Sequence, residues 1–196
     1  MATALERPSS YKFSVCAVPD RPDLIEVHTR IGNDYQLWRH TAQTLFAAAT
    51  ILSREYERVR STLPRSGRGR LPMELYTVWT TPMLLAFGVE CLIKAIWVKQ
   101  GHILARDGKY VPMCKNECHD LVRLCGVAGI ALNPTEREAL DRISRIAHSI
   151  GRYPVSRSAE NRSQYTWGTN DDRTIEALIA RLKAELRKHV TRIQRQ

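Results

Sequence analysis

The chain has 196 residues, of which 43% are hydrophobic and 26% are charged, a composition typical of a globular domain with its own core. It carries 30 Lys and Arg residues against 20 Asp and Glu residues, a formal net charge of +10. This excess favours a polyanionic partner, RNA or DNA before a membrane surface, and the plainer alternative is a soluble protein with surplus cations. The first residues contain no basic stretch followed by an apolar run, so we expect no secretory signal and a cytoplasmic location.

Residues 1–30 differ in pattern from the rest of the chain. Within them, two short runs of β-favouring residues flank the stretch PDRPD at residues 19–23. Proline and aspartate in such a stretch favour a turn. We therefore predict an N-terminal extension with a small β-hairpin, followed by a helical domain over residues 31–196.

A helical period begins at the start of that domain. Residues 32–62 predict a long helix that Asn33 or Asp34 caps. Its predicted buried stripe comprises Leu37, Thr41, Leu45, Ala48 and Leu52. The following residues 63–72, LPRSGRGRLP, form either a solvated basic linker or an RNA contact.

The most apolar part of the chain lies within residues 73–99. It contains Glu90 and Lys94, and its charge-free part is too short to span a bilayer comfortably. We therefore expect a buried core helix and no membrane span. Pro82 is expected to kink or divide this helix, and Gly101 to terminate it.

Three further helices are expected after a loop over residues 101–117. The first is short and covers residues 118–126. The second, over residues 133–150, starts with a capping Asn133 and with Pro134 in the first turn. The third covers residues 171–196, with a stripe formed by Ile175, Leu178, Ile179, Leu182, Leu186, Val190 and Ile193. The sum is an all-α, four- or five-helix, up-down bundle.

A helical wheel divides residues 136–150 into two arcs. The apolar arc, expected to face the core, holds Ala139, Leu140, Ile143, Ile146, Ala147 and Ile150. The remaining arc holds Glu138, Asp141, Arg142, Ser144, Arg145, His148 and Ser149. Its acidic and basic residues form i,i+4 pairs of the kind found on solvated helix faces.

The same outward arc suits a second interpretation, RNA cleavage without a metal. Histidine transfers protons near neutral pH, and arginine donates forked hydrogen bonds to phosphate oxygens. One histidine cannot conveniently serve both sides of an in-line attack. A two-fold dimer that pairs this helix with its copy would supply two histidines and two arginines to one cleft.

Four motifs of the chain resemble those of the HEPN superfamily of helical bundles. They are a Glu-x-x-x-Lys core helix (Glu90, Lys94), a His-Asp-Leu element (His119), the arginine–histidine motif RISRIAH (residues 142–148) and the Arg-Tyr-Pro tail GRYP (residues 151–154). The resemblance implies a homodimer that cuts RNA at its interface without a metal or other cofactor, in defence or a stress response. It assigns catalysis to Arg142 and His148.

The chain departs from the family pattern at two positions. Active members commonly have a polar residue directly after the arginine, where this chain has Ile143. Some toxin members have a tyrosine that a partner nucleotidyltransferase modifies, and this chain has Ile150 there. The alternative expectation is therefore a non-catalytic HEPN module that binds a nucleotide, RNA or a partner protein.

Several further residues are candidates for supporting roles. RNA or nucleotide contacts are expected from Arg145 and from three residues of the following loop, Arg152, Tyr153 and Arg157. Glu90, Lys94 and His119 are candidates for supporting positions around the site. For Glu90 and Lys94 the alternatives are an ion pair at the margin of the core or a Glu90 that orients Arg142.

The five cysteines are expected to be reduced, since their number is odd and no export signal is present. Cys114, Cys118, His119 and Cys125 are residue types that zinc accepts, but their spacing matches no common zinc motif. His119 has a separate explanation in the His-Asp-Leu element, where it packs or caps a helix. We therefore assign no metal site, and the chain shows no P-loop or dinucleotide fingerprint.

Overall fold

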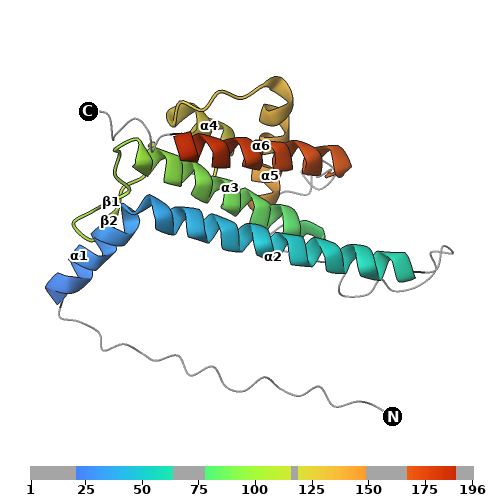
Figure 1. Ribbon diagram of the computed structural model, residues 1–196, viewed down its shortest axis with the longest axis horizontal. Helices are drawn as coiled ribbons and strands as arrows, with labels where there is room; N and C mark the ends of the chain where they lie inside the picture. The colour runs from blue at the N-terminus through green and yellow to red at the C-terminus, as the bar shows by residue number, and fades with distance from the viewer. Residues whose placement is uncertain (1–20, 64–77, 116–118, 149–166, 189–196) are drawn as a thin grey trace, which may run out of the picture.

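The computed structural model describes residues 21–63, 78–115, 119–148 and 167–188 (Figure 1). Within these ranges the chain forms six helices and one two-stranded antiparallel sheet, which confirms a mostly helical fold. The elements are α1 (Arg21–Gly32), α2 (Tyr35–Thr62), α3 (Thr80–Lys99), β1 (Ala105–Arg106), β2 (Lys109–Tyr110), α4 (Leu121–Val127), α5 (Pro134–His148) and α6 (Thr169–Lys188).

Helix α3 is the central element, in contact with α2, α4, α5 and α6. Among the described helices it alone is long and apolar enough to cross a membrane, and 67% of its apolar window is buried inside the molecule. A helix that is apolar on all sides is buried in this way, so the predicted core helix is confirmed. Pro82 lies in its first turn, where proline is tolerated, and Gly101, with φ +94°, follows its C-cap residue.

Helix α2 packs lengthwise on α3, and its buried face is shifted by about one residue from the predicted stripe. The buried residues are Ala42, Phe46, Ala49 and Val59, whereas the predicted Leu37 and Thr41 are exposed. The shift follows from the contact between Phe46 and Gly88 of α3. A Cβ at Gly88 would lie 2.4 Å from Cε1 of Phe46, so the missing side chain admits the ring.

The long helices run in alternating directions, as contacts at their ends show (Figure 1). Lys99, at the end of α3, donates a hydrogen bond of 2.5 Å to the carbonyl oxygen of Leu186 near the end of α6. Its Nζ also lies 4.9 Å from the ring centroid of Tyr35, at the start of α2. Glu136, in the first turn of α5, bonds Arg181 in the second half of α6. Thus α2 opposes α3, and α5 runs back along α6.

The predicted N-terminal hairpin is wrong where the structure describes it, since residues 21–32 form α1. Proline in a first helical turn favours helix initiation, and Pro22 occupies that place. Gly32 then allows a close approach to β1, because a Cβ there would lie 2.4 Å from that of Ala105. Contact with the sheet thus outweighs the β propensity of this segment.

The small sheet lies where a loop was expected. Its turn residues Asp107 and Gly108 have φ angles of +52° and +70°, the conformation that Asp-Gly favours in a two-residue hairpin. Asn33 fixes the hairpin to α1 and α2, because its Oδ1 accepts from the amides of Leu104 and Ala105 and its Nδ2 donates to the Ala105 carbonyl. Asp34, the other predicted cap, accepts from the Gln36 amide and begins α2.

Helix α5 begins where the sequence predicts, whereas α4 begins at Leu121 instead of residue 118 and α6 at Thr169 instead of residue 171. Asp120 caps α4, and Asn133 and Glu136 form a reciprocal capping box at α5. The predicted core faces of α5 and α6 are buried wherever they are described. Ser144 was expected on the outward arc and is buried instead, because its Oγ accepts the Leu121 amide at 3.3 Å where α4 covers α5.

Candidate functional site

A buried carboxylate organises the candidate site. Glu90 of α3 is only 7% exposed, and burying a charged carboxylate requires partners. Its Oε1 accepts from Lys94 Nζ at 2.6 Å, one turn along the same helix, and its Oε2 lies 2.6 Å from His119 Nδ1. The ion pair expected between Glu90 and Lys94 is therefore present, and it is inside the protein.

His119 lies between this carboxylate and a second histidine. An ionised carboxylate only accepts hydrogen bonds, so Nδ1 of His119 donates to Glu90 and the tautomer is set by that bond. The His119 ring also meets Phe87 edge-on, with centroids 5.5 Å apart, and lies 5.3 Å from the ring of His148. Its φ is +35°, a backbone conformation that non-glycine residues adopt at a cost. His119 therefore packs beside a helix start, and the cap itself is Asp120.

His148 is the last residue of α5 and is half-buried beside His119. The helical wheel places it correctly outside the core face of α5. The wheel does not reveal that the segment before α4 covers that position. As a result, two histidines and a glutamate from three parts of one chain lie in contact, and we name Glu90, His119 and His148 the histidine cluster.

Arg142 is held by an acidic residue that the sequence did not identify. Its Nε and Nη2 donate to Oδ1 of Asp171 at 2.9 and 2.5 Å, and Nη1 lies 3.8 Å from Glu138. Asp171 is buried in the first turn of α6, and the Arg142 side chain is 33% exposed. Glu90 thus does not orient Arg142, because both of its oxygens are engaged elsewhere. The nearest sequence signal for Asp171 is its place in an acidic first helical turn.

The expected RNA-contact residues are only partly described. Arg145 is exposed and pairs with Asp141 one turn earlier on α5, as the i,i+4 spacing predicts. Arg152, Tyr153 and Arg157 lie outside the described residues, and so does Ile150. The structure brings His119 and His148 together. The contribution of the Arg-Tyr-Pro tail to the site stays a prediction.

Lys94 is enclosed by aromatic rings as well as by its carboxylate. Its Nζ lies 5.4 Å from the centroid of Trp38 on α2 and 5.1 Å from that of Tyr110 on β2. Cation–π contacts of this kind stabilise an ammonium group that has left bulk water. Lys94 thereby connects Glu90 to the hairpin, so its role is to hold the carboxylate in place. Neither ring carried a sequence signal for this contact.

The cysteines considered for zinc do not gather among the described residues. Within the described ranges, no group of three His, Cys, Asp or Glu side chains is arranged to hold a metal ion, and Cys118 lies outside those ranges. Burial raises the pKa of the Cys125 thiol to about 12, so this thiol is protonated at neutral pH. Cys91, Cys114 and Cys125 are free thiols.

Comparisons with models of known protein families, with curated proteins and with solved structures find no match for this chain.

Proposed function

We propose that this protein is a metal-independent endoribonuclease, a HEPN-like up-down bundle that acts as a homodimer. The observation that carries the proposal is the histidine cluster, in which a buried Glu90 orients His119 against His148. Arg142 lies on the same helix as His148, so α5 presents both a proton-transfer group and a cation. The alternating directions of α2, α3, α5 and α6 support the bundle assignment.

The reaction requires a base, an acid and a stabilised phosphorane. The 2′-hydroxyl oxygen attacks the adjacent phosphorus while a base removes its proton, and the bond to the 5′ oxygen breaks as an acid protonates that oxygen. The products are a 2′,3′-cyclic phosphate and a 5′-hydroxyl end, with no change in oxidation state. Histidines suit both proton transfers, and Arg142 donates to the equatorial oxygens.

The spacing within the histidine cluster supports a dimeric site. Ring centroids 5.3 Å apart are in van der Waals contact, so a phosphate cannot lie between the two rings. Attack and departure take place on opposite sides of phosphorus. The histidines of one chain therefore serve one side, and a second copy of α5 supplies the other.

A non-catalytic HEPN-like module is the second candidate, and one observation favours it. Arg142 donates two hydrogen bonds to Asp171, which neutralises its charge and fastens α5 to α6. In that role Arg142 is a structural clamp, and the protein binds RNA, a nucleotide or a partner protein without turnover.

The test is RNA cleavage in EDTA by the wild type and by Arg142→Ala, His148→Ala and His119→Ala. We expect cleavage to fall by about 10²–10⁴-fold for either histidine, the typical contribution of general acid–base catalysis. Wild-type products should carry 2′,3′-cyclic phosphate and 5′-hydroxyl ends. Arg137→Ala, an exposed position near the start of α5, is the matched control and should cleave like the wild type.

Two outcomes reject the nuclease. One is the absence of cleavage by pure wild-type protein, and the other is equal cleavage by the wild type and all three variants, which indicates a contaminating enzyme. RNA binding that persists without turnover, and weakens steeply with salt, supports the non-catalytic alternative.

A further inference from the structure

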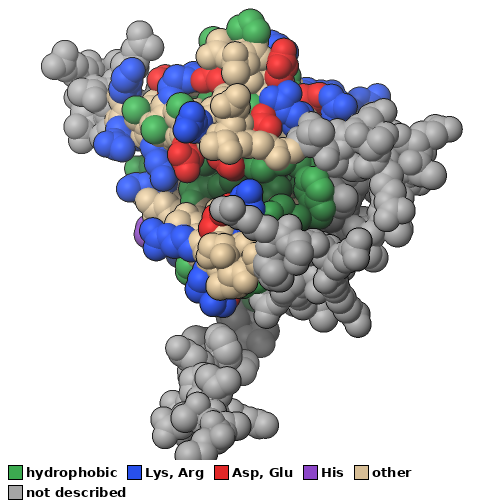
Figure 2. All heavy atoms as spheres, turned by 90° about the vertical axis from the view of Figure 1, so that its right-hand side faces the viewer, with side chains coloured by type: hydrophobic (Ala, Val, Ile, Leu, Met, Phe, Trp, Pro, Cys, Tyr) green, Lys and Arg blue, Asp and Glu red, His purple; other side chains and the backbone are tan. Residues whose placement is uncertain are grey.

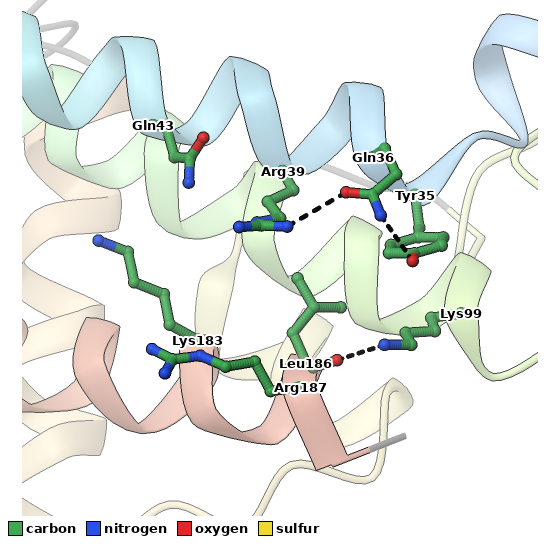
Figure 3. Close-up of a pocket in the computed structure, with 8 residues that line it drawn as sticks. All are labelled: Tyr35, Gln36, Arg39, Gln43, Lys99, Lys183, Leu186 and Arg187. Atoms are coloured by element: carbon green, nitrogen blue, oxygen red, sulfur yellow. Dashed lines mark hydrogen bonds between the residues drawn. The ribbon is translucent and has the colours of Figure 1, made fainter. Parts of the chain in front are cut away.

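A cavity of about 230 Å³ opens between α2, α3 and α6 at the end of the molecule where α2 begins and α3 and α6 end (Figure 3). We name it the cationic pocket. It is lined by Tyr35, Gln36, Arg39, Gln43, Lys99, Lys183, Leu186 and Arg187. Four of these residues are cationic and none is acidic. In Figure 3 the side chains of Arg39 and Lys183 extend into the space between α2 and α6, and the side chain of Arg187 lies along α6.

The four cations are not neutralised by carboxylates of the described residues. Arg39 donates to the neutral amide of Gln36 at 3.2 Å, and Lys183 Nζ lies over the ring of Phe46, at 5.1 Å from its centroid. The segment after α6, residues 189–196, has no acidic side chain. This is an uncompensated concentration of positive charge, which a bound anion would stabilise.

Lys99 is the buried member of the cationic pocket, with 9% of the residue exposed. One of its three N–H donors binds the carbonyl oxygen of Leu186, a neutral acceptor. Burial, followed by the nearby charge of Arg39, lowers the pKa of Lys99. Lys99 and Arg39 are therefore two positive groups close together without a counter-charge. An anion bound between them would reduce both the cost of burying the Lys99 charge and the repulsion between the two cations.

The other end of the molecule has a different surface. Figure 2 shows that end, where α2 ends and α3 and α6 begin, with acidic side chains interspersed among the Lys and Arg side chains. Acidic side chains thus accompany the basic ones at that end of the molecule and are absent from the lining of the cationic pocket. An excess of Lys and Arg spread evenly over the surface would not produce this difference between the two ends.

We infer that the cationic pocket binds a phosphate group that carries two negative charges, such as a terminal phosphate. Forked arginine donors match phosphate oxygens, and four cations exceed the charge of a single carboxylate or an internal phosphodiester. Complete small-molecule sites commonly measure about 300–1,000 Å³. A cavity of about 230 Å³ therefore suits the phosphate group, with the remainder of its ligand outside.

The experiment is calorimetric titration of the full chain with inorganic phosphate, against sodium chloride at equal ionic strength. Arg39→Gln and Arg187→Gln each remove one charged donor from the cationic pocket, so we expect affinity to fall about tenfold for either. Arg173→Gln removes the same charge from an exposed position of α6 outside the pocket and should bind like the wild type. Arg39 is exposed, so Arg39→Gln should retain the wild-type melting temperature.

A second arm identifies the source of the phosphate. A 2′-O-methyl oligoribonucleotide with a 5′-phosphate is compared with the same oligomer ending in a 5′-hydroxyl. Neither can be cleaved by attack of a 2′-hydroxyl, so the result is independent of nuclease activity. Tighter binding of the phosphorylated oligomer, abolished by Arg39→Gln, assigns the cationic pocket to RNA ends.

Phosphate binding without that preference assigns the cationic pocket to a small phosphate compound. The inference is overturned if inorganic phosphate binds no better than chloride. It is also overturned if the Arg39, Arg187 and Arg173 variants all bind phosphate with wild-type affinity.

Discussion

Arg142 and Asp171 connect α5 to the first turn of α6 through two hydrogen bonds to one carboxylate oxygen. The carboxylate is buried, and its Oδ2 also accepts the Gly168 amide at 3.1 Å. This arrangement fixes the guanidinium plane and leaves Nη1 outside the Asp171 contact. Asp171 is therefore a positioning residue if the protein cleaves RNA, and a structural anchor in either function.

Exchanging Asp171 for Asn tests this role. Asp171→Asn weakens the charge-assisted bonds, and we expect the free energy of unfolding to fall by about 1–3 kcal/mol. If Asp171 positions Arg142 for catalysis, kcat falls about tenfold while KM stays constant. Asp141→Asn is the matched control, since Asp141 pairs with Arg145 on an exposed face, where a pair contributes at most about 1 kcal/mol. Chemical denaturation and RNA-cleavage kinetics are the two measurements, and an unchanged kcat for Asp171→Asn contradicts the positioning role.

Among the secondary-structure elements, the contact between α2 and α3 depends on a glycine. The Phe46 ring occupies the space that a side chain at Gly88 would fill, with Cε1, Cδ1 and Cζ at 2.4, 2.7 and 3.0 Å from the position of a Cβ. Both residues are buried in the interface. An added methyl group must displace the ring or separate the helices, because protein cores are close-packed.

Gly88→Ala is expected to destabilise the protein by about 1–3 kcal/mol, the usual cost of overpacking. The control is Gly126→Ala in α4, where no atom lies within 4 Å of the added Cβ. There alanine should be neutral or stabilise the helix by up to about 1 kcal/mol. Urea denaturation followed by circular dichroism measures both. Equal stabilities of the two variants would show that α2 and α3 do not meet at this contact.

At the scale of the whole molecule, the two ends differ in the distribution of charge. The cationic pocket lies where α2 begins, and surface charge is mixed where α2 ends. The proposed catalytic reaction adds a further requirement, that a second copy of α5 approach the histidine cluster. The oligomeric state in solution therefore tests directly whether the proposed dimeric active site can form.

Light scattering after size-exclusion chromatography should give a mass of twice the 22.4 kDa of one chain. If one cleft uses His148 from both chains, mixing the wild type with an excess of His148→Ala should lower cleavage per wild-type chain, because a mixed dimer has only one of the two His148 side chains. The mixture must be given time for subunits to exchange, which labelled chains can confirm. A monomeric mass at full activity falsifies the dimeric site.

Prediction from sequence succeeded where one periodic pattern and one local cap determine the structure. The core faces of α5 and α6 followed from their apolar spacing, and Asn133 caps α5 as predicted. Such features depend on neighbours within a few residues. The buried stripe of α2 differs from the predicted one because its position depends on Gly88 in another helix. Helix α1 formed where β-favouring residues predicted a strand, because its conformation depends on contact with the hairpin, which is distant in the sequence.

The sequence by itself determined a helical chain, the outward arc of α5 except at Ser144, and the proximity of Glu90 to Lys94, all of which follow from helical spacing. Only the tertiary structure decided the partners of that arc. His148 lies beside His119 and Arg142 beside Asp171, in each pair 29 residues apart. The tertiary structure also places four cationic residues around one cavity, namely Arg39, Lys99, Lys183 and Arg187. The physical reason is that helical periodicity fixes which way a side chain faces, whereas the residue it meets depends on how separate helices pack.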